Sequence, residues 1–242
     1  MNTMSLIREE FKLWEALSDN VYKDSTYKAV INSELQESGI GFSNLVLKLT
    51  QDQKISSGDA SKLKSMFNQH KSKGNFIRFN SSDGEDNIVE TGRYYYLNEV
   101  KIDELDENCK ILKTNDIESF GSIVRNGFCY DDGFETGFIK RMRNISDKLD
   151  CHFYLMSVKN NIVGATSFFK HDSQLWYCMM NTCVLPKYRG LKYSTALISQ
   201  SHRDLCAPVY ARTSNPVMET SLLSLGYEET DTFQILSLDT LV

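Results

Sequence analysis

The chain has no excess of positive charge. Over its 242 residues, 27 Lys and Arg stand against 32 Asp and Glu, which gives a formal net charge of -5. Binding to a nucleic-acid backbone or to an anionic membrane depends on a basic field. We therefore expect neither a nucleic acid nor a membrane among the partners of this protein.

Long apolar runs are also missing. No run reaches the roughly 18 residues that a membrane-spanning helix requires. The first residues, MNTMSLIREEFKLW, lack the basic stretch followed by an apolar core that marks a secretory signal. The sequence therefore predicts a globular protein that folds in a cytoplasm.

The cysteines form no CxxC pair, and all six lie in the second half of the chain: Cys109, Cys129, Cys151, Cys178, Cys183 and Cys206. This distribution argues against a disulfide framework. Cys178 and Cys183 stand five residues apart in an expected strand, so their side chains should point to opposite faces and should not share a zinc ion. We expect buried thiols and no metal site.

The first half of the chain is charged and irregular in pattern. Residues 1 to about 38 carry apolar side chains at helical spacing. Three strands are expected after them, at Ser43–Leu49, Asn75–Asn80 and Arg93–Asp103, with a helix-compatible stretch at Gly58–Lys73. The acidic stretch Asp103–Asn108 has the polarity of a linker and indicates a domain boundary. It divides the chain into domains of residues 1–105 and 106–242.

The second half is more regular. The expected elements are a strand at Cys109–Lys113, helices at Ile117–Asn126 and Glu135–Asp150, a hairpin between His152 and Lys170, a strand at Leu175–Leu185, a helix carrying Leu191, Ile198 and Leu205, a strand at Val209–Thr213, a helix after Asn215, and a strand at Phe233–Leu238. This order predicts an α/β fold with a mixed sheet.

Several common catalytic motifs are missing. The sequence contains no GxxxxGK[ST] loop, GxGxxG turn, GxSxG elbow or HExxH helix, which argues against the usual nucleotide, dinucleotide, hydrolase and metalloprotease sites. The four histidines, His70, His152, His171 and His202, are far apart in the sequence. Without paired spacing, we expect each to be a surface or packed residue.

A strand–turn–helix segment is the best site candidate. It reads VLPKYRGLKYSTALISQ from Val184 to Gln200, and a second segment, TSNPVMETSLLSLGYEE, follows it. A helix N-terminus presents backbone N–H groups and the positive end of the helix dipole, so a loop that approaches closely can bind a pyrophosphate. In the second segment, Asn215 caps a helix and Gly226 ends it.

These two segments resemble the Gcn5-related N-acetyltransferase (GNAT) superfamily. That superfamily has a strand ending in V-x-P-x-x-R/Q-x-x-G-x-G/A before a helix, and a second block N-x-x-(A)-x-x-x-Y-x-x-x-G-F. The matching residues are Val184, Pro186, Arg189, Asn215 and Gly226, with Tyr227 in place of the usual Phe. The resemblance covers about the last 135 residues.

The resemblance implies a GNAT-like mixed central sheet flanked by helices. It also implies acetyl-CoA as co-substrate and direct transfer of its acetyl group to an amine, whose class the residues leave open. No metal is implied. The residues that would bind the cofactor are Cys183, Val184, Arg189, Gly190, Leu191, Lys192, Tyr193, Ser194 and Asn215.

The chain also departs from the superfamily pattern. Lys192 stands where the pattern has Gly, and Ser194 where it has Gly or Ala. Lys192 either blocks the phosphate or contacts it through its ammonium group. Leu222 replaces the Tyr that often protonates the departing thiolate, and it is equally a core residue. The strand before the turn has no Glu or Asp to act as a base, which leaves a water relay. Cys183 as a covalent acyl acceptor is a minor alternative.

The first half resembles a second, degenerate acetyltransferase-like unit without the V-x-P-x-x-R loop. We expect it to be structural or to form a wall of the acceptor site. The main alternative for the whole chain is a non-catalytic acetyltransferase-like binding or scaffolding protein. A third hypothesis is an α/β protein whose apolar pocket binds another ligand.

Overall fold

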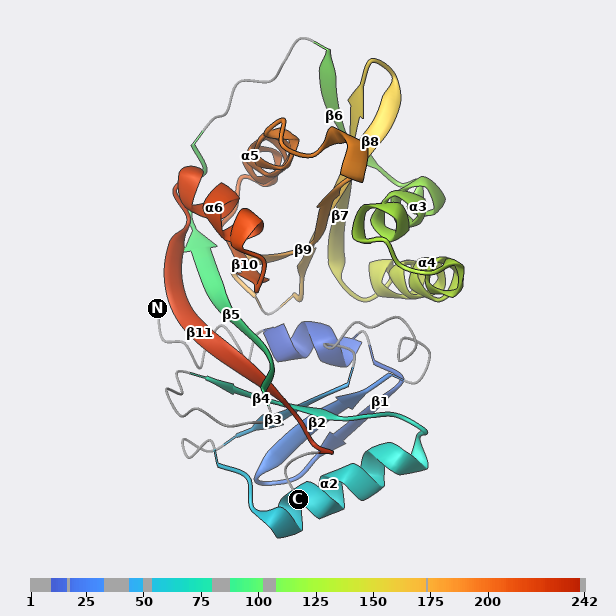
Figure 1. Ribbon diagram of the computed structural model, residues 1–242, viewed down its shortest axis with the longest axis vertical. Coiled ribbons are helices and arrows are strands. Elements are labelled where there is room, and N and C mark those ends of the chain that lie inside the picture. The colour runs from blue at the N-terminus through green and yellow to red at the C-terminus, as the bar shows by residue number, and fades with distance from the viewer. Residues whose placement is uncertain are drawn as a thin grey trace. The chain divides into compact units, whose positions relative to one another are not determined.

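The computed structural model describes residues 10–16, 18–32, 44–49, 54–79, 88–101, 108–172 and 174–239. The chain divides into two compact units, residues 1–93 with 231–242 and residues 94–230 (Figure 1). Strands β5 (Ile88–Leu97) and β11 (Glu228–Ser237) each run from one unit into the other.

These units differ from the predicted halves. The predicted boundary at residue 105 lies outside the described residues. The last residues, 231–242, belong to the first unit and not to the second. The reason is strand pairing, because the end of β11 is antiparallel to β4 (Asn75–Phe79) of the first unit, with Ile235 opposite Ile77.

The first unit contains a five-strand arrangement in the order β1-β2-β3-β4-β11. Its other strands are β1 (Asn20–Lys23), β2 (Tyr27–Ile31) and β3 (Leu45–Lys48). The β3–β4 pair is parallel, and helix α2 (Ser57–Gln69) forms the crossover between them. Helix α2 buries Ala60, Leu63 and Phe67 against the strands, so this unit has its own hydrophobic core.

The helical expectation for residues 1 to about 38 is wrong over residues 20–31. Residues 10–16 are helical, but β1 and β2 form an antiparallel hairpin. A carboxylate oxygen of Asp24 accepts hydrogen bonds from the backbone N–H groups of Thr26 and Tyr27, both at 2.8 Å. This side-chain turn competes with the helix. Alternate residues Tyr27, Ala29 and Ile31 are then buried at strand spacing.

The second unit follows the predicted order of elements. They are β6 (Cys109–Thr114), α3 (Ile117–Phe128), α4 (Asp132–Ser146), β7 (Asp150–Val158), β8 (Asn161–Lys170), β9 (Tyr177–Val184), the 3-10 turn η2 (Pro186–Tyr188), α5 (Tyr193–Leu205), β10 (Val209–Thr213) and α6 (Pro216–Ser224). The strand order is β11-β5-β10-β9-β8-β7-β6. Strands β6 to β9 pair antiparallel, and β10 pairs parallel with β9. The predicted α/β fold with a mixed sheet flanked by helices is confirmed.

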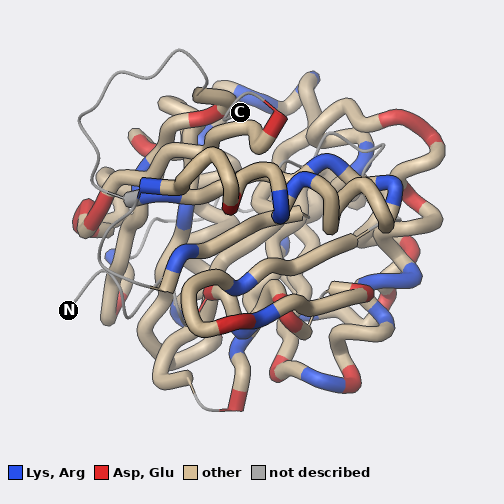
Figure 2. Tube along the Cα trace, turned by 90° about the horizontal axis from the view of Figure 1, so that it is seen from below, with Lys and Arg blue, Asp and Glu red and all other residues tan. Residues whose placement is uncertain are grey.

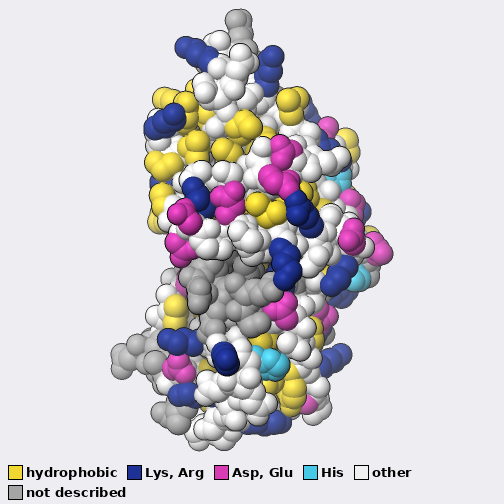
Figure 3. All heavy atoms as spheres, turned by 90° about the vertical axis from the view of Figure 1, so that its right-hand side faces the viewer, with side chains coloured by type: hydrophobic (Ala, Val, Ile, Leu, Met, Phe, Trp, Pro, Cys, Tyr) yellow, Lys and Arg dark blue, Asp and Glu magenta, His cyan; other side chains and the backbone are white. Residues whose placement is uncertain are grey.

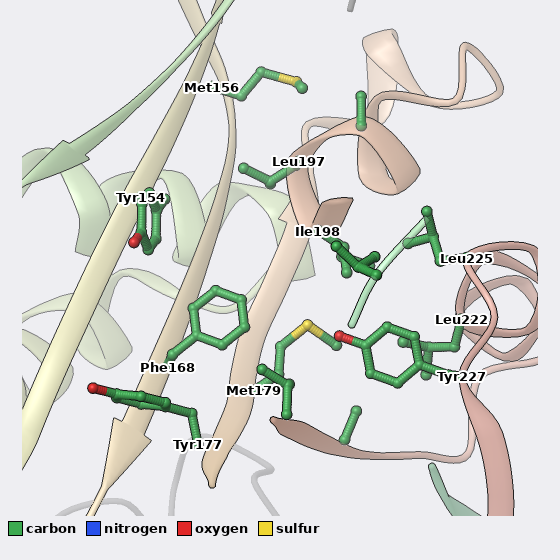
Figure 4. Close-up of a cluster of buried hydrophobic side chains, with 14 of the residues drawn as sticks. Tyr154, Met156, Phe168, Tyr177, Met179, Leu197, Ile198, Leu222, Leu225 and Tyr227 are labelled. Carbon is green, nitrogen blue, oxygen red and sulfur yellow. The ribbon is translucent and has the colours of Figure 1, made fainter. Parts of the chain in front are cut away.

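Helices cover both faces of this sheet. On one face, Leu197 and Ile198 of α5 and Leu222 of α6 pack on strand residues that include Phe168 and Met179 (Figure 4). On the other face, Phe120 of α3 contacts Phe153 of β7 with ring centroids 5.0 Å apart. Burial of apolar surface on both faces explains why the sequence of β9 is apolar at odd and even positions alike.

A β-bulge in β9 changes which residues share a face. In the pairing of β8 with β9, Ala165 lies opposite Cys183 but Ser167 lies opposite Met180, so β9 has one extra residue. Within this stretch Asn181 has a positive φ of 55°. As a result, Cys178 lies opposite Phe169 on the α3 face, and Cys183 contacts the carbonyl of Ile123 in α3. The expectation that the two cysteines point to opposite faces is therefore wrong. Their positions are still five apart along the strand, a distance of roughly 16 Å, which is too far for a shared metal ion.

Charged residues of both signs are spread along the described chain (Figure 2). Among the described residues, no helix combines the length and the apolar character needed to cross a bilayer.

A buried histidine joins α5 to the segment after α6. His202 is 2 % exposed, and its Nε2 lies 3.1 Å from the carbonyl oxygen of Ala207. A carbonyl only accepts, so Nε2 carries the proton and Nδ1 accepts from the hydroxyl of Tyr227 at 2.8 Å. Burial lowers the pKa of His202 to about 4. The imidazole is therefore neutral in the folded protein near pH 7.

Acid should destabilise the second unit through His202. The unfolded imidazole titrates near 6.5, above the folded pKa of about 4. Between these values the unfolded state binds more protons, so the free energy of unfolding falls as pH falls, by roughly 3 kcal/mol over the interval. Thermal melts from pH 7 to pH 4 should show this decline, and it should be smaller in His202→Gln. An equal decline in the variant would contradict the assignment.

Candidate functional site

The turn after β9 contains two residues with left-handed backbone angles. The turn begins with η2, where the N–H of Tyr188 donates to Leu185 O at 2.9 Å. Gly190 follows with φ 78°, and Lys192 has φ 59° and ψ 14°. No atom outside its chain neighbours lies within 4 Å of the position that a Cβ on Gly190 would occupy.

Lys192 therefore adopts an angle that favours glycine. For an L-residue this conformation costs roughly 1 kcal/mol. The next residue, Tyr193, is the first residue of α5. A left-handed residue followed by a right-handed one turns successive backbone N–H groups toward the same side, which forms a concavity for an anion. The side chain of Lys192 does not prevent the backbone from taking this conformation.

The N-terminus of α5 differs from those of α2, α3, α4 and α6. Helices α2, α3, α4 and α6 each have an N-cap side chain that accepts a backbone hydrogen bond: Ser56 for α2, Asp116 for α3, Asp131 for α4 and Asn215 for α6. The N-cap of α5 is Lys192, whose ammonium can only donate. Within the described residues, this ammonium has no ion pair or hydrogen bond. The helix thus begins with a positive end and an uncompensated cation.

Arg189 connects the turn to the end of α3. Its Nε donates to the carbonyl of Val184 at 3.1 Å, and a terminal nitrogen donates to the carbonyl of Gly127. Both acceptors are backbone groups at the ends of elements, β9 and α3. The guanidinium therefore holds the turn in place, and these two donors are already used within the protein.

Strands β9 and β10 diverge beside the turn. Their parallel pairing runs from Tyr177 opposite Val209 to Met179 opposite Ala211. Strand β9 continues to Val184, still paired with β8 on its other side. The edge of β9 from Met180 to Val184 is therefore separated from β10, at the position of the bulge at Asn181.

A cleft of about 320 Å³ lies along this edge. Eight of the nine residues predicted to bind a cofactor line it, namely Cys183, Val184, Arg189, Gly190, Lys192, Tyr193, Ser194 and Asn215. Leu191 is not among the lining residues, and its side chain is 57 % exposed. The volume is at the lower end of the range of about 300–1,000 Å³ that is typical of ligand pockets.

The other lining residues were not predicted from the sequence. They are Gly127, Phe128 and Cys129 at the end of α3, Val217, Met218 and Ser221 on α6, Thr182 on β9, and Tyr188 in the turn. No motif identifies the α3 residues, because only the folded sheet brings the end of α3 to β9. Gly127 permits this approach, since a Cβ there would lie 2.6 Å from the Sγ of Cys183.

Cys183 and Leu222, for which the sequence left two roles possible, are both buried. Burial raises the pKa of the Cys183 thiol to about 12, and the thiol donates to Ile123 O at 3.6 Å. A protonated thiol is a weak nucleophile, which disfavours covalent transfer through Cys183. Leu222 is fully buried in the core cluster of α5, α6 and the sheet, and does not line the cleft.

None of the four histidines lines the cleft. His202 is buried in the core, as described above. His152 lies near the start of β7. Its Nε2 is 3.0 Å from an oxygen of Asp150, and the hydroxyl of Tyr177 donates to the same carboxylate. This group of three residues therefore lies beside Tyr177 at the start of β9, whereas the cleft lies at the end of β9.

The comparisons with known proteins identify the fold. No protein-family model and no curated protein matches the sequence. Among solved structures, a GCN5-related N-acetyltransferase from Kribbella flavida superposes with a TM-score of 0.73 at 7% identity, over 97% of this chain and 94% of that one. The chain has the GNAT fold.

Two further GNAT structures extend this likeness. A tandem GNAT protein from the clavulanic acid biosynthesis pathway superposes with a TM-score of 0.57 at 12% identity, over 90% of this chain and 82% of that one. A GCN5-related N-acetyltransferase from Sphaerobacter thermophilus gives 0.58 at 10% identity, over 88% and 77%. These matches cover 88–97% of the chain, so the likeness in fold extends over both units.

Substitution of Gly127 should disturb the wall of the cleft. In Gly127→Ala, the new methyl group would press on Cys183, and overpacking of this kind costs about 1–3 kcal/mol. Gly133→Ala is the matched control, because its Cβ would meet only an oxygen of Asp131 at 3.4 Å. Denaturant unfolding should show destabilisation for Gly127→Ala alone. Equal stability of the two variants would contradict the close packing.

Proposed function

We propose that the second unit binds acetyl-CoA in the cleft and transfers its acetyl group to an amine. The observation that supports this proposal is the arrangement of groups at the start of α5. There a left-handed Lys192, an uncapped helix N-terminus and an unpartnered ammonium, among the described residues, meet at the edge of a cleft in a GNAT fold. Together these features fit a pyrophosphate.

The residues present suit the phosphate part of the cofactor. The backbone of Lys192, Tyr193 and Ser194 would hold the pyrophosphate, and the ammonium of Lys192 would add a charge-assisted contact. Gly190 leaves space in the turn before them. Arg189 would act indirectly, because its described hydrogen bonds hold the turn against α3 and β9.

The edge of β9 suits the pantetheine part. The segment from Met180 to Val184 is separated from β10 and offers backbone groups to an extended ligand. Bound acetyl-CoA supplies an activated thioester. The contribution of the protein would be to position the acceptor amine beside it and to direct backbone N–H groups of β9 at the developing negative charge.

Proton transfer would not use the Tyr of the superfamily pattern. Leu222 occupies that position and is buried in the core. The residues with hydroxyl groups that line the cleft are Thr182, Tyr188, Tyr193, Ser194 and Ser221. A CoA-type thiol is a tolerable leaving group near neutral pH, so the loss of a general acid would slow transfer by about 10²-fold or more without preventing it. Water would accept the proton of the amine.

The buried Leu222 also favours a second candidate function, a CoA-binding protein that has lost turnover. Release of free thiol from acetyl-CoA in the presence of any member of an amine panel would exclude this candidate. The first unit has its own core and is proposed to be structural.

Calorimetric titration with acetyl-CoA tests the proposal. Absence of heat and of any thermal shift at millimolar ligand would remove it. In Lys192→Gly, the new residue accepts the left-handed backbone angles without strain, and the side chain with its ammonium is lost. We expect acetyl-CoA to bind about three- to tenfold more weakly to this variant, with a weaker dependence on salt.

Lys187→Gln is the matched control. Lys187 is an exposed lysine in the same turn, does not line the cleft, and stacks over the ring of Tyr188 at 4.9 Å. Its substitution should leave the affinity unchanged. Tighter binding by Lys192→Gly would mean that the lysine obstructs the phosphate site.

A further inference from the structure

An exposed aromatic ring stands at the end of the cleft that is formed by α3. Phe128 is the last residue of α3, lines the cleft and is 43 % exposed. Apolar side chains gather on the side of the second unit that carries α3 and α4 (Figure 3). A large apolar side chain left in contact with water beside a cleft is a common mark of a binding surface.

The ring of Phe128 is the last in a series of stacked rings. Its centroid lies 5.5 Å from that of Tyr130, with an interplanar angle of 24°. Tyr130 lies 4.3 Å from Phe134, which stacks on Phe138 at 5.0 Å. Phe134 and Phe138 are buried. The exposed ring is therefore supported from behind by the core of the α3–α4 pair.

The backbone of this segment is also held in place. Cys129 ends α3 in a left-handed conformation, and the N–H of Tyr130 donates to Arg125 O at 2.9 Å. The guanidinium of Arg125 pairs with Asp132 at 2.5 Å and with Glu135 at 3.4 Å. A ring held in this way loses little conformational entropy when a ligand packs on it.

Apolar side chains of α6 line the same cleft. Val217 is 73 % exposed and Met218 is partly buried, both in the first turn after the Asn215 cap. A flexible methionine adapts to different apolar shapes. The cleft is thus lined by the cationic side chain of Lys192 and by apolar side chains from two helices, Phe128 of α3 and Val217 and Met218 of α6.

The apolar part lies beside the separated edge of β9. Gly127, next to Phe128, is in contact distance of Cys183, and both line the cleft. In the proposed mode of binding, the phosphates lie at Lys192 and the thiol end of the cofactor runs along this edge of β9. Phe128 then lies beside the arm of the cofactor that runs along β9, where its ring can contact an acceptor that approaches this arm.

We propose that the acceptor is an amine carried by an aromatic or bulky apolar group, which stacks on Phe128 and packs against Val217 and Met218. This assignment rests on the proposed function. It names Phe128 as the residue that determines specificity among amines. An aromatic stacking contact predicts a preference of about two- to tenfold over an amine without a ring.

The test measures binding and turnover with two amines, 2-phenylethylamine and ethanolamine, on protein saturated with CoA or acetyl-CoA. Calorimetric affinity and kcat/KM should both favour 2-phenylethylamine. Phe128→Ala should abolish the preference, and Phe128→Tyr should retain it. Leu223→Ala is the control, because Leu223 is an exposed residue of α6 that does not line the cleft, and it should leave the preference unchanged.

Other outcomes separate the two proposals. If wild-type protein binds CoA but shows no preference between the amines, the acceptor assignment is wrong and the proposed function stands. If Phe128→Ala weakens CoA itself and leaves the amine preference intact, the ring serves the cofactor and the assignment is overturned. If wild-type protein does not bind CoA, both proposals fail.

Discussion

The geometry of the cleft depends on the guanidinium of Arg189. Its hydrogen bonds join the turn that carries Arg189 to the end of β9 at Val184 and to the end of α3 at Gly127, which lies 62 residues earlier in the sequence. Carbonyl groups at the ends of helices and strands lack partners within their own element, so a charged donor that satisfies two of them has a large effect. Loss of this residue would release both the turn and one wall of the cleft.

The close approach of α3 to β9 follows from the same connection. Gly127 has no side chain, so the helix can approach Cys183 closely. That contact buries the thiol, raises its pKa and keeps it protonated. One packing feature thus places Phe128 at the cleft and at the same time removes Cys183 from chemistry.

Two residues beside the cleft, Asn181 and Lys192, have left-handed backbone angles. Asn181 bulges β9 where the strand separates from β10, and Lys192 takes a left-handed angle where α5 begins. Such residues cost free energy and persist because the surrounding structure holds them. At Asn181, the side-chain amide donates to Ser167 Oγ at 3.0 Å, and Ser167 in turn donates to Met180 O at 3.0 Å. The bulge is therefore fixed by neighbouring side chains.

The sequence alone determined the order of elements in the second unit and the position of the turn. Periodicity, the Asn215 cap and the Val184–Arg189 pattern are local signals, and local signals can be read along a chain. Through the resemblance to the GNAT superfamily, the sequence located eight residues of the cleft. The hairpin at residues 20–31 was missed because the Asp24 turn was not recognised among helical spacing.

Only the tertiary structure decided the rest. The bulge at Asn181 puts Cys178 and Cys183 on the same face of the sheet, whereas the sequence predicted opposite faces. One extra residue shifts every later side chain of the strand to the other face. The contribution of Gly127 and Phe128 to the cleft, and the return of residues 231–242 to the first unit, depend on contacts between distant segments. Such contacts are set by packing and strand pairing, which no local pattern in the sequence encodes.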